Sequence, residues 1–133
     1  MNKVSRWMLW CCFMAGLLGA ADFAPARESA SRPADFPLIS ASDLPAEGRE
    51  ALALIRKGGP FPYAKDGSIF SNRERILPRQ PRGFYHEFTV KTPRSRDRGA
   101  RRIICGGAVG ILQGAEACYY TDDHYASFKK IKE

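Results

Sequence analysis

The chain has 133 residues, enough for one domain with a modest hydrophobic core and too few for two separate cores. It carries 21 Lys and Arg residues against 14 Asp and Glu, a formal net charge of +7 at pH 7. A positive field of this size favours polyanionic partners such as nucleic acid, anionic lipid or cell-wall polymer.

Residues 1–21 have the three parts of a secretory signal. Lys3 and Arg6 form a basic start, an apolar run follows from Trp7 to Leu18, and small residues precede a cleavage site near Ala21. The apolar run is shorter than the roughly 20 residues that a membrane-spanning helix needs, so an uncleaved anchor is the weaker interpretation. We therefore expect a secreted protein, extracellular or periplasmic, with no stable membrane association.

Residues 22–35 are rich in Ala, Pro, Ser and Arg and contain little that can be buried, which is typical of a flexible leader. We place the folded domain at residues 36–133. No internal repeat is visible within it.

The first regular element that the pattern predicts is an amphipathic helix over Pro45–Lys57. Asp43 precedes it as a candidate cap, Pro45 falls in its first turn, and Gly58–Gly59 ends it. The apolar side of this helix carries Ala51, Leu52 and Ile55.

After the helix the pattern changes to that of strands. Asp66–Gly67 marks a tight turn that leads into Ser68–Phe70. Four segments rich in aromatic or β-branched residues follow: Gly83–Thr92, Arg101–Gly106, Ala117–Thr121 and Ser127–Ile131. One helix followed by these strands predicts an α+β fold, with the helix packed on one face of a twisted antiparallel sheet.

Export also decides how the cysteines are interpreted. Cys11 and Cys12 lie in the signal, so the mature protein keeps Cys105 and Cys118, an even pair in an oxidising compartment. We expect a disulfide between them; the alternative is that Cys105, beside two isoleucines, is a buried free thiol. A metal site is not expected, because further ligands at suitable spacing are missing.

Polar residues in the second half of the chain suit acid/base chemistry on an anion. Glu87 and His124 are the candidate proton-transfer pair, since an unperturbed imidazole titrates near neutrality. Strand alternation places Glu87 on the face of its strand away from Phe88 and Val90. Arg102 would lie on the same face as Glu87 only if the register between the two strands allows it. Periodicity alone cannot fix the register, and a surface ion pair is the alternative.

Five stretches of the chain, in uninterrupted order after Leu44, resemble the guanyl-specific microbial ribonucleases, the family that includes barnase. They read GPFPYAKDGSIFSNRE, LP, YHEFTVKTP, RGARRIICG and YYTDDHYASFKKI, and begin at Gly59, Leu77, Tyr85, Arg98 and Tyr119. The resemblance implies a helix packed against a twisted antiparallel sheet, with the active site on the exposed face of the sheet. It also implies a monomer that cleaves single-stranded RNA without metal or cofactor.

Carried over position by position, the resemblance makes Glu87 the general base and His124 the general acid. It makes Arg98 and Arg102 the residues that bind the phosphate. RNA supplies its own nucleophile, the 2′-OH, which needs a base, and the departing 5′-oxygen needs an acid. Planar guanidinium groups suit the charge that builds on the phosphate oxygens.

The resemblance also implies a guanine site. Main-chain N–H groups near Asn72 and Arg73 would donate to O6, and the Glu74 carboxylate would accept from N1–H and N2–H. Phe70 and Tyr125 would stack on the base, although Phe70 could equally be a core aromatic. Arg75 departs from a plain match because it adds a charge beside Glu74, so the strictness of the guanine preference stays open.

Several features remain outside these assignments. Ala108–Ala115 resembles an enlarged hairpin turn with no functional account, and His86 is interpreted as structural because alternation turns it away from Glu87. The family also suggests an acidic cytoplasmic inhibitor resembling barstar. A secreted nucleic-acid-binding module without catalysis, and a small disulfide-closed structural or inhibitor-like protein, are the two rival classes.

Overall fold

The computed structural model describes residues 35–107 and 117–132. The predicted signal, the leader up to residue 34 and the Ala108–Ala115 turn lie outside the described residues. Within the part that is described, no helix is long and apolar enough to cross a membrane.

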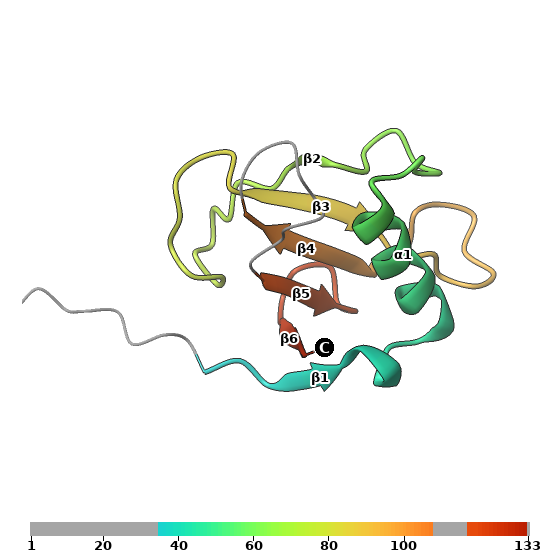
Figure 1. Ribbon diagram of the computed structural model, residues 1–133, viewed down its shortest axis with the longest axis horizontal. Helices are drawn as coiled ribbons and strands as arrows, with labels where there is room; N and C mark the ends of the chain where they lie inside the picture. Colours follow the sequence, from blue (N-terminus) through green and yellow to red (C-terminus); the bar gives the residue numbers. More distant parts are fainter. Residues whose placement is uncertain (1–34, 108–116, 133) are drawn as a thin grey trace, which may run out of the picture. The chain divides into compact units, whose positions relative to one another are not determined.

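One helix packs on one face of a six-stranded sheet, which confirms the predicted α+β fold (Figure 1). The strand order across the sheet is β1-β6-β5-β4-β3-β2. In chain order the elements are β1 (Leu38–Ser40), the short 3-10 turn η1 (Ala41–Asp43), α1 (Ala46–Lys57), β2 (Ser68–Ile69), β3 (Tyr85–Thr89), β4 (Arg102–Gly106), β5 (Ala117–Thr121) and β6 (Lys129–Lys132).

The sheet is mixed rather than wholly antiparallel. The strand β1 lies beside β6 and runs parallel to it, with Leu38 opposite Lys130 and Ile39 opposite Ile131. The other neighbouring strands pair antiparallel. Three residues give no readable alternation, and their partner lies at the far end of the chain, so sequence periodicity did not find β1.

The helix α1 follows its prediction closely. It begins at Ala46, one residue later than expected, and Gly58 ends it in the left-handed region with φ of 84°. Asp43 was wrongly predicted as the cap: it lies in η1, and Pro45 occupies the N-cap position with no side-chain hydrogen bond. Because the side chains of Leu52 and Ile55 are buried against the sheet, packing rather than a cap holds the helix.

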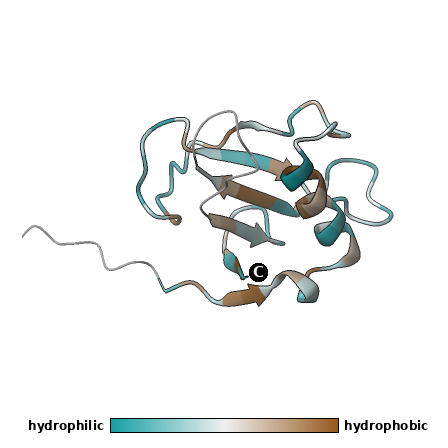
Figure 2. Cartoon of the chain, viewed as in Figure 1, coloured by the Kyte–Doolittle hydropathy of each residue, from teal (hydrophilic) through white to brown (hydrophobic). Residues whose placement is uncertain are grey.

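Each face of the sheet carries its own hydrophobic cluster. The cluster under the helix contains Leu44, Leu52, Ile55, Phe88, Val90, Ile103, Cys105, Tyr120 and Ile131. The second cluster contains Leu77, Tyr85, Ile104, Tyr119 and Phe128. The face that carries Glu87 is therefore not wholly polar, because Tyr85 and Ile104 lie on it as well. Figure 2 shows the contrast between a largely hydrophobic β4 and a β3 that is hydrophilic over most of its length.

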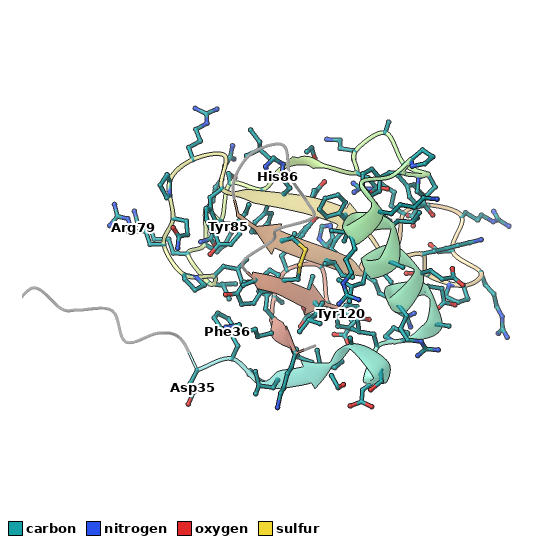
Figure 3. The ribbon with its side chains drawn as sticks, viewed as in Figure 1. Asp35, Phe36, Arg79, Tyr85, His86 and Tyr120 are labelled. Atoms are coloured by element: carbon teal, nitrogen blue, oxygen red, sulfur yellow. A yellow bond between two sulfur atoms is a disulfide. The ribbon has the colours of Figure 1, made fainter. Side chains whose placement is uncertain are left out.

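The predicted disulfide is present. Cys105 and Cys118 lie directly opposite each other in β4 and β5, and their sulfur atoms are bonded. The bond is drawn in yellow across the two strands in Figure 3. Both residues pack in or against the cluster under the helix, so the bridge lies on the face of the sheet away from Glu87.

Candidate active site

The register of β3 and β4 decides which polar side chains meet. Thr89 lies opposite Arg102, and Glu87 lies opposite Ile104. Residues opposite each other, and alternate residues along one strand, point to the same side of a sheet. Glu87, Thr89 and Arg102 therefore share the face that the helix leaves open, which is the placement that periodicity had left undecided.

Three neighbours hold the Glu87 carboxylate. Its Oε1 accepts hydrogen bonds from Arg98 Nη2 and from Ser68 Oγ, each at 3.3 Å. Its Oε2 accepts a short hydrogen bond from the hydroxyl of Tyr125. The Glu87 side chain is 13% exposed, so a substrate can reach the carboxylate although its orientation is fixed.

These contacts set the charge of Glu87. Burial by itself raises the pKa of this carboxyl, but hydrogen bonds from Tyr125, Arg98 and Ser68, together with the Arg98 charge, outweigh burial and lower the pKa below its ordinary value. The group is consequently ionised at neutral pH. An ionised carboxylate with a fixed orientation is what a general base requires.

The two arginines differ in their surroundings. Arg98 donates from Nε to Thr89 Oγ1 at 3.0 Å and from Nη2 to Glu87. Arg102 is only 3% exposed, and its Nη1 donates to three main-chain carbonyls, those of Arg98, Gly99 and Arg101. Arg102 Nε is buried without a hydrogen-bond partner, and none of the described carboxylates forms an ion pair with this guanidinium.

A buried guanidinium N–H group without a hydrogen-bond partner is costly. The cost falls when an anion binds, because guanidinium groups form strong charge-assisted hydrogen bonds with phosphate. The guanidinium group of Arg102 therefore favours an anion such as phosphate on the sheet face that carries Glu87.

His124 and Tyr125 lie in the short connection between β5 and β6. Both have positive φ angles, 55° and 72°, which non-glycine residues seldom adopt. The main-chain N–H of His124 donates to Ala100 O at 3.2 Å, which ties this connection to the arginine-bearing loop before β4. The imidazole of His124 is exposed and lies against the ring of Tyr125, with centroids 4.9 Å apart. Tyr125 thus contacts both members of the candidate proton-transfer pair.

Asp123 holds this strained connection, and sequence reasoning missed it. Its carboxylate accepts hydrogen bonds from Thr121 Oγ1 at 2.8 Å, Ser127 N at 2.9 Å and Ser127 Oγ at 2.6 Å. The bonds from Ser127 contribute most to lowering the pKa of Asp123 to about 2. The signal in the sequence was an Asp followed four residues later by Ser around the candidate histidine.

Ser68 and Thr89 were also missed. Ser68 lies opposite Glu87 in the register of β2 and β3, and Thr89 accepts a hydrogen bond from Arg98. Neither contact has a local sequence signal, because each joins residues that are brought together only by strand pairing. His86, in contrast, is structural as predicted, since its Nδ1 is 2.9 Å from Gly67 O.

The predicted guanine loop adjoins the same face of the sheet. Asn72 has a φ of 47°, and its side-chain amide bonds both the N–H and the carbonyl of Leu77, so this side chain shapes the loop. Arg73 and Glu74 are exposed, and neither side chain has a hydrogen bond or ion pair among the described residues. The Glu74 carboxylate is therefore available to a ligand.

Phe70 has the core contacts that one of its two interpretations expected, and its stacking on a base stays a prediction. It packs against the second hydrophobic cluster, and its ring also stacks on that of Tyr125, with centroids 5.1 Å apart and planes 28° from parallel. With the rings in this contact, a base either separates them or stacks on an outer face. The structure thus brings Phe70 into contact with Tyr125, the residue whose hydroxyl bonds Glu87.

No group of three or more His, Cys, Asp or Glu side chains that could hold a metal ion occurs within residues 35–107 and 117–132. The polar groups that converge on the open face are a carboxylate, two guanidinium groups, a phenol and, at the edge, an imidazole. This set can exchange protons and bind an anion.

Comparisons with known proteins agree with this geometry. The model of the ribonuclease family matches residues 27–132. The chain is 50% identical over 94 residues to guanyl-specific ribonuclease St of Saccharopolyspora erythraea, an alignment that covers 71% of this chain and 86% of that protein. It is 50% identical over 95 residues to guanyl-specific ribonuclease Sa of Kitasatospora aureofaciens, covering 71% and 93%.

A solved structure of ribonuclease Sa2 in complex with mononucleotides superposes with a TM-score of 0.67 at 43% identity, covering 74% of this chain and 95% of that one. A second structure of ribonuclease Sa2 contains guanosine-2′-cyclophosphate and has a TM-score of 0.64. With a family model that spans most of the chain and relatives at half identity, the chain belongs to the guanyl-specific microbial ribonucleases.

Proposed function

We propose that this ribonuclease is a guanyl-preferring endonuclease that cleaves single-stranded RNA by transesterification through a 2′,3′-cyclic phosphate and then hydrolyses that ester. The observation that carries the proposal is that an ionised, oriented Glu87 shares one sheet face with the buried guanidinium of Arg102, whose Nε has no hydrogen-bond partner. A structural or inhibitor-like protein would have no need of such a costly arrangement.

In the first step, Glu87 takes the proton from the 2′-OH of the nucleotide on the 5′ side of the scissile bond. The 2′-oxygen forms a bond to phosphorus, and the bond from phosphorus to the 5′-oxygen breaks. His124 gives its proton to that 5′-oxygen. Arg98 and Arg102 bind the non-bridging oxygens, where negative charge increases in the transition state.

The second step reverses the two proton transfers. His124, now neutral, takes a proton from water, whose oxygen bonds to phosphorus. The bond from phosphorus to the 2′-oxygen breaks, and Glu87 returns its proton to that oxygen. Both residues are left as they began.

Guanine preference follows from Glu74. Only guanine presents two adjacent donors, N1–H and N2–H, on the edge that faces a single carboxylate. The exposed Glu74, which has no partner among the described residues, supports this assignment. Stacking on Phe70 or Tyr125 would contribute about 1 to 3 kcal/mol per base.

The test is an assay of the domain without its signal, in the presence of a chelator. Single-stranded RNA should be cut after guanosine, with a 2′,3′-cyclic phosphate as the first product, and DNA should survive because it lacks the 2′-OH. If the protein bound RNA and left it intact, the result would instead favour the rival class, a nucleic-acid-binding module without catalysis. Cleavage that requires a divalent metal would also exclude the mechanism.

The contacts of Glu87 predict the pH dependence of the reaction. The base acts when ionised, and its lowered pKa places the acid limb of kcat/KM below the pH expected for an ordinary Glu. Tyr125→Phe removes a hydrogen bond that favours the charged carboxylate, so the acid limb should move to higher pH. Ser68→Ala should move it in the same direction by less, because its contact contributes less.

The matched control for that series is Tyr63→Phe, which removes a phenol from the loop before β2, away from the contacts that hold Glu87. Its pH profile should equal that of the wild type. If the limb of Tyr125→Phe stayed with the wild type while the other properties changed, Tyr125 would not act through Glu87.

We also propose that the protein is exported. Support comes from the three-part pattern of residues 1–21 and from the cysteine pair, since disulfides persist in oxidising compartments. Both tryptophans, Trp7 and Trp10, lie in the predicted signal, so exported material should show tyrosine emission alone. A tryptophan band in that material would show that the segment is retained.

An acidic cytoplasmic inhibitor is a further part of the proposal. Unexported enzyme would attack the RNA of its own cell, and an acidic partner would be steered electrostatically to the basic site, as barstar is to barnase. The mature domain, expressed in a bacterial cytoplasm without an inhibitor, should therefore be toxic. Abundant folded protein in healthy cells would remove the reason for an inhibitor.

A further inference from the structure

The segment Ser71–Gly83 carries four exposed arginines, a cluster in sequence whose side chains the proposed chemistry does not use. Its basic residues are Arg73, Arg75, Arg79 and Arg82, and its single acidic residue is Glu74. None of the four guanidinium groups has a hydrogen bond or ion pair among the described residues. The cluster therefore has unused capacity for anions.

This segment is anchored to the sheet. Leu77 is 1% exposed within the second hydrophobic cluster, and the Asn72 amide bonds it at both its N–H and its carbonyl. Tyr85 donates from its hydroxyl to Pro78 O at 2.7 Å, and Phe84 N donates to Pro81 O at 3.1 Å. Since Arg79 and Arg82 each directly follow one of these prolines, their main chain is held while their side chains reach into solvent.

The anchored segment lies at the end of the site opposite to the phosphate-binding arginines. Along β3, Thr89 contacts Arg98, Glu87 follows on the same face, and Tyr85 contacts Pro78. Thr89 and Tyr85 are four positions apart along the strand, which corresponds to about 13 Å. Figure 3 shows Arg79 projecting outward on the same side of the molecule as Tyr85.

The order of groups on this face indicates the path of the RNA. The scissile phosphate is the 3′-phosphate of the guanosine and would lie at Arg98 and Arg102. The base would lie at Phe70–Glu74, which continues directly into the anchored segment. The strand that leaves the guanosine away from the scissile phosphate is the one linked to its 5′-oxygen.

We propose that Arg79 and Arg82 bind backbone phosphates of the nucleotides on the 5′ side of the guanosine. The inference rests on the proposed function and extends it from a dinucleotide to a longer RNA. Arginine suits the role because its planar donors bind phosphate in a bidentate manner, and such contacts carry affinity without reading bases.

The experiment compares three substrates by kcat/KM: GpU, the same dinucleotide with three adenosines added on the 5′ side, and the same with three added on the 3′ side. The wild type should prefer the 5′-extended substrate over GpU. The double variant Arg79→Gln/Arg82→Gln should lose that preference and cleave GpU at the wild-type rate.

Salt dependence gives an independent measurement. Each phosphate contact to a single strand contributes about 0.7 to the slope of log affinity against log salt concentration. The double variant should therefore show a salt dependence that is shallower by about 1.4 in slope on the 5′-extended substrate, and an unchanged salt dependence on GpU. The charge-conserving variant Arg79→Lys/Arg82→Lys should retain most of the wild-type slope.

The matched control is Lys57→Gln/Lys91→Gln, which removes the same charge on the helix side of the sheet: Lys57 ends α1, and Lys91 lines a cavity with residues of that helix. It should leave the substrate preference intact. A 5′ preference that survives in Arg79→Gln/Arg82→Gln, or an advantage that arises only from 3′ extension, would overturn the inference. Failure of the wild type to cleave GpU at all would overturn the proposed function as well.

Discussion

Replacing either member of the proton-transfer pair should reduce cleavage of RNA by roughly 10²- to 10⁴-fold, the usual contribution of one general acid or base. In Glu87→Gln the amide cannot take the 2′-OH proton, although it keeps the shape of the carboxylate. In His124→Ala the departing 5′-oxygen has no acid. The measurement is kcat/KM on GpU, with the cyclic product separated from the hydrolysed one.

Matched controls separate chemistry from folding. Glu50→Gln changes an exposed carboxylate on α1, and His86→Gln changes the histidine that faces away from the site. Both should retain wild-type kcat/KM. Full activity in folded His124→Ala would exclude its assignment as the acid. Equal losses in His86→Gln and His124→Ala would indicate that damage to the fold explains both.

The second large effect concerns the choice of base. Glu74→Ala should lower the ratio of GpN to ApN cleavage by roughly 10²- to 10⁴-fold. The carboxylate accepts two hydrogen bonds from guanine, each bond to a charged group contributes about 1.5 to 3 kcal/mol, and about 1.36 kcal/mol corresponds to a factor of ten. Because adenine lacks both donors, cleavage of ApN should hardly change.

Glu74→Ala should fold normally, since the side chain is exposed and has no hydrogen bond or ion pair among the described residues. Glu50→Ala provides the same truncation on α1 and should leave the GpN to ApN ratio intact. An unchanged ratio in Glu74→Ala would mean that guanine is read by other groups. The companion variant Arg75→Ala tests whether the charge beside Glu74 weakens the preference for guanine. If it does, this variant should raise the GpN to ApN ratio.

Local sequence signals were sufficient where an element depends on its own residues. Helix α1 was predicted to within one residue, because its period of apolar side chains and the glycine at position 58 are both local. The strand β5 was predicted with its observed ends, Ala117 and Thr121. The strand β3, predicted over Gly83–Thr92, is shorter at both ends, and β6 begins at Lys129, two residues later than predicted.

The resemblance of five ordered stretches named the family before any geometry was known, and the comparisons confirm it. The roles of Glu87, His124 and Glu74 came from the same source and stay predictions. Their residue types can be recognised in the sequence, because the reaction requires a general base and a general acid, and guanine recognition requires an acceptor for N1–H and N2–H. The candidate residues could thus be chosen without knowing where they lie.

Their arrangement depended on tertiary structure. Strand pairing decided that Arg102 shares a face with Glu87 and that Ser68 lies beside the carboxylate, because the register between strands is a non-local property. Packing decided that Phe70 stacks on Tyr125 and that Leu77 anchors the segment Ser71–Gly83. The sequence determined which groups can do the chemistry. Burial and strand register depend on residues far apart in the chain, and they decided which of these groups lie together and that the Glu87 carboxylate is ionised.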